Sequence, residues 1–216
     1  MNLNIDRSLT IYSSICFAVL FQVIILTQPA FGIEAELNSN KINYDYRLES
    51  NVTNGTTPNE IAYSNPQHGI FLLFPSKWTF STSGLPEYSQ VAAFYAPLEN
   101  LTDLIPARLT ITVMNYQQNV SLKEFTNLTL TSLNQTNQVK ISSSGPITLA
   151  GRPGHQIVFS TLPNIGSPVS FEIMHSWLVA GNKIYVFQYS AESSKFNKQL
   201  PTVKQILQSL RIDNVR

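Results

Sequence analysis

The sequence predicts a single α+β domain in which a helix near the carboxyl end packs against a β-sheet. Two apolar strands joined by Gly181-Asn182 indicate a hairpin, because this dipeptide suits a tight turn that needs positive φ. The second strand, residues 184–189, is apolar or aromatic on both alternating faces, which is typical of a central strand covered on both sides. The helix that follows, ending near residue 212, places its apolar side chains within an arc of about 120° and so has one face to bury.

The composition allows one ordinary core and points away from nucleic acid and from cysteine chemistry. The 216 residues are 43% hydrophobic and only 12% charged, with a formal net charge of +1. Such a charge offers no broad field to nucleic acid. Cys16, the single cysteine, lies in the leading apolar segment, which excludes a disulfide scaffold and a thiolate metal site in the folded part.

Residues 1–32 predict export. Arg7 is followed by an apolar stretch and then by Ala30-Phe31-Gly32, whose small residues suit a signal-peptide cleavage site. The alternative is an uncleaved membrane anchor through residues 8–32, since no charge interrupts that span and it is long enough to cross a bilayer. Either way, the domain is expected to be extracytoplasmic, secreted or tethered to the outer face of the cell membrane.

Residues 33–62 are interpreted as a polar tether, because Asn, Glu, Ser, Thr and Lys dominate them with little periodicity. As a flexible coil, the tether would span roughly 30 Å between its ends. The alternative is that residues 42–46 add an edge strand. The globular domain is then expected over residues 63–213.

Strands are expected along most of that domain, separated by turns rich in Gly and Pro. Leu109, Ile111 and Val113 alternate with Thr110 and Thr112, which predicts a strand with one buried face. The other strands are expected at residues 69–74, 78–80, 90–96, 139–149, 155–161 and 169–179, and the last of these leads into the turn at Gly181-Asn182.

A further helix is predicted to begin after Ser121. Glu124 follows three residues later and completes a capping box. The face expected to be buried carries Leu122, Phe125, Leu128 and Leu133.

Three stretches of the domain match motifs of one known family. They are Phe71-Leu-Leu-Phe-Pro-Ser-Lys-Trp78, Leu149-Ala-Gly-Arg-Pro-Gly-His155, and Gly181-Asn-Lys-Ile-Tyr185 with the helix that follows it. In this order they resemble the opening strand, a middle turn and the closing strand of the PsbP-like family, named for the extrinsic PsbP subunit of the photosystem II oxygen-evolving complex. The resemblance covers about residues 66–212. It implies an antiparallel sheet sandwiched by helices, an α/β/α arrangement.

The sequence contains no recognised catalytic motif, so we expect a protein that is not an enzyme. Its acidic residues are scattered and suggest no paired carboxylates. The first hypothesis is an exported accessory module that binds an unidentified protein partner in an envelope or membrane-associated complex. The second is a small-ligand or divalent-metal-binding domain of the same fold.

His155 and His175 are the only candidate metal ligands, and no other cofactor is expected. If their two strands pair about Ile165, then Ile157 lies opposite Ile173 and the two histidines face each other with Cβ atoms about 5 Å apart. Two imidazoles could bind zinc or manganese, with a carboxylate or water completing the shell. The alternative is a pair satisfied by backbone or water without metal.

Six Asn-x-Ser/Thr sequons predict glycosylation in an exported chain. They begin at Asn51, Asn54, Asn100, Asn119, Asn127 and Asn134. Asn127 and Asn134 are seven residues apart in the first predicted helix, so both should project from one face, away from its apolar side.

Overall fold

The computed structural model of the chain describes residues 59–82, 90–100, 105–116, 119–136, 138–161 and 169–213. The predicted export segment, the tether as far as residue 58 and the sequons at Asn51 and Asn54 lie outside these residues. Within the described ranges, no helix is both long and apolar enough to cross a membrane.

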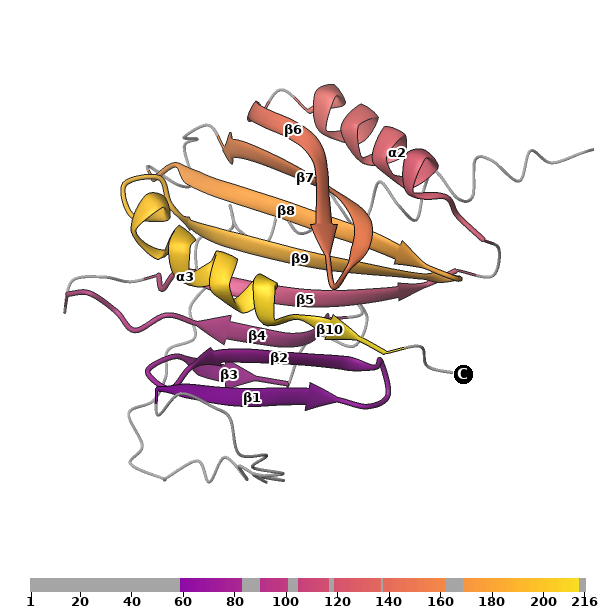
Figure 1. Ribbon diagram of the computed structural model, residues 1–216. Coiled ribbons are helices and arrows are strands. Elements are labelled where there is room, and N and C mark those ends of the chain that lie inside the picture. The colour runs from indigo at the N-terminus through magenta and orange to yellow at the C-terminus, as the bar shows by residue number, and fades with distance from the viewer. Residues whose placement is uncertain are drawn as a thin grey trace, which may run out of the picture.

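The body of the fold is a seven-stranded antiparallel sheet in the order β3-β4-β5-β9-β8-β7-β6 (Figure 1). Its strands are β3 Thr79–Ser81, β4 Gln90–Tyr95, β5 Arg108–Asn115, β6 Val139–Leu149, β7 Arg152–Thr161, β8 Phe171–Ala180 and β9 Lys183–Glu192. The predicted hairpin at Gly181-Asn182 joins β8 to β9, and Gly181 has the positive φ of 64° that such a turn needs. β9 is the central strand and is buried from residue 184 to residue 191, as predicted.

A second, three-stranded sheet closes the fold beside the first. It contains β1 Glu60–Asn65, β2 Ile70–Pro75 and β10 Arg211–Ile212, in the order β1-β2-β10. Because β10 pairs with β2, the end of the chain returns to the first hairpin of the domain (Figure 1). β1 begins at Glu60, inside the segment predicted as a tether, so the predicted domain start at residue 63 is three residues late. Its apolar residues Ile61, Ala62 and Tyr63 are consecutive and do not alternate with polar ones, so a periodicity argument does not find this short edge strand.

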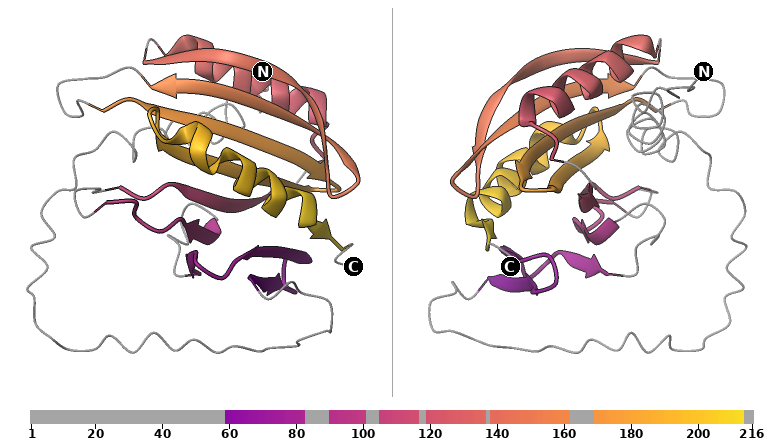
Figure 2. Two further views of the ribbon diagram at one scale, coloured as in Figure 1. Left: turned by 60° about the vertical axis from the view of Figure 1, so that its left-hand side comes forward. Right: turned by 90° about the vertical axis from the view of Figure 1, so that its right-hand side faces the viewer.

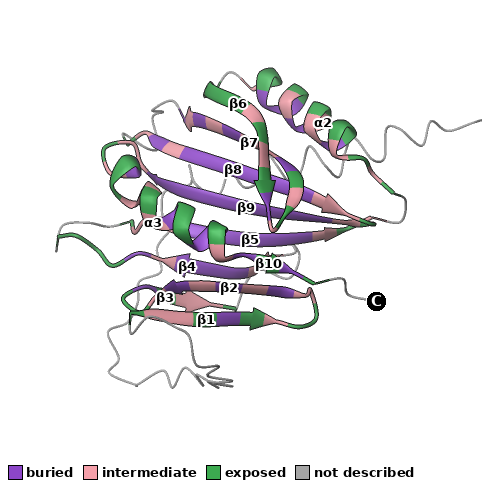
Figure 3. Ribbon diagram, in the orientation of Figure 1, coloured by how far each residue is buried: buried purple, intermediate pink, exposed green. Residues whose placement is uncertain are grey.

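Two helices cover opposite faces of the large sheet, as expected for an α/β/α sandwich (Figure 2). α3, Phe196–Ser209, packs with the small sheet on one face, where it contacts β2 and β9. α2, Leu122–Gln135, lies on the other face against β7. Both helices turn exposed residues outward while the middle strands of the sheet are buried (Figure 3). The seven-stranded sheet therefore has a hydrophobic core on each of its faces.

Two details of the core differ from the sequence-based expectation. Thr110 and Thr112 of β5 are buried along with their apolar neighbours, because β5 lies beside the central strand and not at an edge. On α2, Leu122 and Leu128 are only half-buried, while Phe125 and Leu133 are buried as predicted. Because α2 packs on β7, next to the edge strand β6, part of its apolar face remains partly accessible to solvent.

Candidate functional site

The two predicted histidine ligands do not face each other. In the β7–β8 ladder His155 lies opposite Trp177, and His175 lies opposite Ile157, which corrects the predicted register by two residues. A slip of two residues keeps every side chain on its face of the sheet. Both histidines therefore still point to the α2 side, but on diagonal positions.

Trp177 contacts both imidazoles. Its ring centroid lies 5.2 Å from that of His155 and 5.6 Å from that of His175. The indole is fully buried, stacks edge-on against Phe125 of α2, and donates a hydrogen bond from Nε1 to Thr126 Oγ1 at 3.2 Å. Trp177 therefore packs against both histidines and also against Phe125 of α2.

His175 is a buried, neutral histidine. Its side chain is 3% exposed, and burial lowers its pKa to about 4. Its Nε2 atom has no hydrogen-bond partner. Gln188 of β9 lies opposite it, and Thr110 of β5 lies opposite Gln188, so three buried polar side chains form one row across the sheet.

His155 instead contacts a serine at the sheet edge. Its Nε2 lies 2.8 Å from Ser144 Oγ on the edge strand β6, which sequence reasoning missed because the contact depends on strand register. A nucleophilic triad also contains a serine and a histidine at this distance, but it needs a third group that orients the histidine. Among the described residues, no carboxylate accepts a hydrogen bond from the ring to orient it, and neither surface depression of the domain is lined by the pair. We therefore interpret the contact as a hydrogen bond that satisfies the His155 ring near the edge of the sheet.

The described residues bring no third metal-binding side chain to this region. Among them, no group of three or more His, Cys, Asp or Glu side chains is placed to hold an ion. His68 belongs to the other side of the sheet, where its carbonyl accepts a hydrogen bond of 2.9 Å from the Tyr185 hydroxyl. Metal binding by His155 and His175 thus stays a prediction, and the structure offers these two residues alone for it.

Four of the six sequon asparagines are described residues, and all four are exposed. They are Asn100, Asn119, Asn127 and Asn134. The last two lie on the outer face of α2, as the helical spacing predicts. Whether these residues carry glycan stays a prediction.

Exposed apolar side chains occur at one end of the large sheet, which we call the loop end. This end comprises the β4–β5 connection on either side of residues 101–104, the start of β8, and the turn from β9 into α3. Its residues Leu98, Ile105 and Val169 are 53%, 43% and 39% exposed, and they are the exposed large hydrophobic side chains of the part of the chain that the structure describes. Sequence patterning gave no reason to single them out, because they lie outside regular strands and helices.

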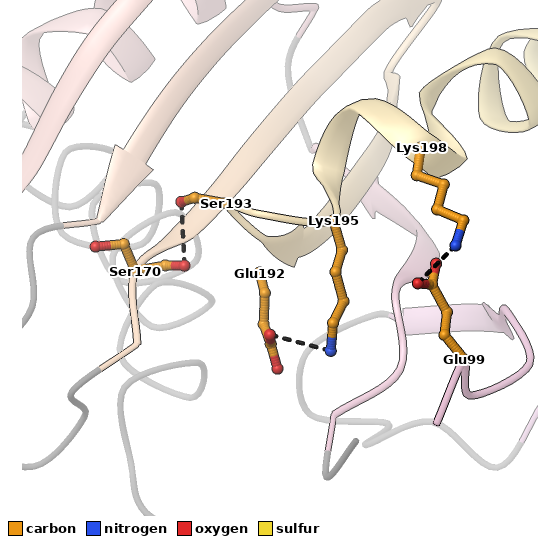
Figure 4. A network of polar contacts seen from close by, with 6 residues as sticks. All are labelled: Glu99, Ser170, Glu192, Ser193, Lys195 and Lys198. Atoms are coloured by element: carbon orange, nitrogen blue, oxygen red, sulfur yellow. Dashed lines mark hydrogen bonds and ion pairs between the residues drawn. The ribbon is translucent and has the colours of Figure 1, made fainter. Parts of the chain in front are cut away.

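Polar contacts hold the loop end together (Figure 4). Lys198 of α3 donates to Glu99 of the β4–β5 connection at 2.8 Å, and Lys195 lies 3.1 Å from Glu192. Behind them, the backbone N–H of Ser193 donates to the Ser170 carbonyl at 2.9 Å. Ion pairs at a protein surface contribute little to stability, about 0–1 kcal/mol each. They link the β4–β5 connection, the start of β8 and the turn from β9 into α3, so charged side chains lie at the same end of the sheet as the exposed apolar ones.

Two depressions flank the sheet. The one at the loop end, between Leu98, Ile105 and Lys195, holds only about 10 Å³, room for about one water molecule. At the opposite end, an open groove of about 500 Å³ runs between the β6–β7 turn and the end of α3. Its lining includes Gly151, Leu210 and Arg211. The depression at the loop end is therefore too small to enclose a ligand, whereas the groove has room for a small molecule.

Comparisons with known proteins identify the fold. No protein-family description and no curated protein sequence matches the chain. Among solved structures, the cyanobacterial PsbP (CyanoP) from Synechocystis sp. PCC 6803 matches with a TM-score of 0.54 at 12% identity, covering 74% of this chain and 96% of that one. LpqN of Mycobacterium tuberculosis, involved in cell envelope biogenesis, matches with a TM-score of 0.52 at 14% identity, covering 71% and 90%.

A third structure has a similar extent of likeness. PA94 from Pseudomonas aeruginosa, a protein of unknown function, matches with a TM-score of 0.51 at 12% identity, covering 73% of this chain and 99% of that one. The chain therefore has a PsbP-like fold, as the sequence motifs indicated. At these identities the likeness shows the fold alone.

Proposed function

We propose that this protein is an exported, noncatalytic accessory module that binds a protein partner of an envelope or membrane-associated complex through the loop end of its large sheet. The observation that carries the proposal is that Leu98 and Ile105 line one depression at that end, and that Val169, also exposed, precedes β8 at the same end of the sheet. Single exposed apolar residues need no explanation, whereas apolar residues that adjoin one another on the surface favour an interaction site.

The partner surface expected from this chemistry is apolar at its centre and charged at its rim. Protein interfaces have that anatomy, with apolar anchors surrounded by polar contacts that exclude water. At the loop end, Leu98 and Ile105 would supply the anchors, and Lys195, Lys198 and Glu99 the rim. The adjoining depression is too small for an organic ligand, which favours a protein partner there.

Export is the second part of the proposal. The apolar segment in residues 1–32 supports it, as does the similarity to LpqN, which is involved in cell envelope biogenesis. If the segment is cleaved, amino-terminal sequencing of the mature protein should begin near Ile33. A chain that begins at Met1 and leaves the membrane only with detergent would support the anchor instead. Recovery of the protein from the cytosol would contradict both.

Partner binding is tested with tagged full-length protein purified from solubilised membranes of its natural source. The variant Ile105→Asp puts a charge into the apolar centre, and Ser143→Asp puts the same charge on the exposed middle of β6 as a matched control. We expect the same partner to purify with wild type and Ser143→Asp and to be lost with Ile105→Asp. Retention by Ile105→Asp, with an unchanged thermal transition, would remove the loop end from the proposal.

A second candidate function is small-ligand binding at the open groove beside the β6–β7 turn. Its volume of about 500 Å³ is in the usual range for ligand sites. Arg211 and Asp213 would supply charged contacts, although Arg211 also lies 5.7 Å from the Phe71 ring. A ligand found in the natively purified protein, and lost with Arg211→Ala while partner binding persists, would favour this candidate.

A further inference from the structure

We propose that Asn127 receives an N-linked glycan before α2 folds, and that the hydroxyl of Thr129 serves this modification and not the folded domain. The proposal rests on the export part of the proposed function, since the sugar transfer takes place on exported chains. Its starting observation is that the sequon Asn127-Leu128-Thr129 lies in the middle of a helix, with Asn127 exposed and Thr129 0% exposed.

Thr129 has no hydrogen bond that explains its hydroxyl. Its Oγ1 is buried and without a partner, which is costly for a polar atom. The other hydroxyls on the inner side of α2 are used: Ser132 Oγ donates to the Leu128 carbonyl at 2.9 Å, and Thr126 Oγ1 accepts from the Trp177 indole. Valine has the same shape as threonine and would fill this position without the buried polar atom.

The neighbouring sequons do not share this property. The hydroxyl residue of the Asn119 sequon is Ser121, which caps α2 by accepting from the Glu124 backbone N–H at 3.2 Å. That of the Asn134 sequon is Thr136, whose Oγ1 accepts from the Gln138 backbone N–H at 3.2 Å. Only in the Asn127 sequon, among these three, is the hydroxyl left without a structural role.

The folded helix cannot present this sequon to a transferase. A sequon is recognised through both its asparagine amide and its hydroxyl, and Thr129 is inaccessible once α2 packs on the sheet. The transfer must therefore occur on the unfolded segment, with a polyprenyl-phosphate-linked oligosaccharide as donor. The bond from Asn127 Nδ2 to the sugar C1 forms as the bond from C1 to the lipid phosphate oxygen breaks. The amide loses a proton, and the lipid phosphate leaves with the bonding electrons.

The glycan would then lie on a surface distinct from the loop end. Asn127 and Asn134 project from the outer face of α2, whereas the loop end lies beyond the strands and beside the start of α3. A sugar chain on the outer face of α2 is compatible with packing of the helix, because the buried residues lie on its other side. It would keep this face in solvent and leave the loop end open to a partner.

Site-resolved mass spectrometry of the full-length protein from its natural source tests the modification. We expect glycan on Asn127 in wild type and in Thr129→Ser, which keeps the sequon, and none in Thr129→Val. Glycan on Asn119 or Asn134 with a bare Asn127 would overturn the inference while leaving export intact. A cytosolic, unmodified chain would overturn both, and the amino-terminal sequence separates the two cases.

Two further measurements test the order of events and the role of Thr129. In cell-free synthesis, membranes that carry the transferase and the lipid-linked donor should modify Asn127 when present during translation and not when added after folding. Equal modification in both cases would refute the order. In protein made without glycosylation, Thr129→Val should raise Tm, by about 2–4 °C for each kcal/mol gained. A lower Tm would show that the hydroxyl serves the fold.

Discussion

His175 should make the stability of this fold depend on pH in the mildly acidic range. Its imidazole is buried on the α2 side of the sheet, where desolvation lowers the pKa from 6.5 to about 4. In the unfolded chain the same imidazole takes up a proton near pH 6.5, whereas in the folded domain it resists protonation down to about pH 4. Its neutral form therefore favours folding fully above pH 6.5, and that contribution is lost as the pH falls from 6.5 toward 4.

The magnitude follows from linkage. The folded and unfolded pKa values of His175 differ by about 2.5, and each pKa unit corresponds to about 1.4 kcal/mol. The free energy of unfolding should therefore fall by about 2 kcal/mol between pH 7 and pH 5, and by about 3 kcal/mol by pH 4. A loss of this size is a large part of the stability of an ordinary domain.

Urea unfolding of wild type and His175→Leu at pH 7, 6 and 5 measures this dependence. The leucine variant should lose most of the change between pH 7 and pH 5, because no buried group remains to be protonated at that position. His155→Gln is the matched control: the pKa of His155 is also lowered by burial, but its ring is only half-buried and contacts Ser144. If His175→Leu follows the wild-type pH curve, the buried neutral imidazole is not the cause.

Three further changes test the packing around α2 and the β7–β8 ladder. Gly154→Ala should destabilise the domain by about 1–3 kcal/mol in denaturant unfolding, because its Cβ would lie 2.6 Å from the Trp177 carbonyl oxygen. Gly145→Ala is the control and should cost much less, because the space around the new Cβ is open. Trp177→Ala should cost about 3–5 kcal/mol, since it removes a fully buried indole, whereas Thr126→Val removes only its hydrogen bond and should cost about 1 kcal/mol. Ser121→Ala should cost about 1 kcal/mol through loss of the capping box, visible as a lower Tm; an unchanged Tm would mean that the cap contributes nothing to this helix.

The sequence alone determined the features that depend on local periodicity and turn chemistry. The apolar stripe from Phe196 to Leu210 can be buried only on one side of a helix, and α3 has that form. Gly181-Asn182 permits a tight turn, and the strand after it is apolar on both faces, which places it in the middle of a sheet. Ser121 and Glu124 likewise specify the start of α2 through contacts within a single turn.

The tertiary structure decided what depends on how distant segments meet. The β7–β8 pairing predicted for His155 and His175 was wrong because a two-residue slip preserves the face of every side chain, so the alternation pattern fits both registers. The Ser144–His155 contact, the burial of Thr129 and the proximity of Leu98 to Ile105 follow from such pairings and from packing. Local sequence records which face a side chain occupies, but long-range pairing selects its neighbours, and the chemistry of a site depends on those neighbours.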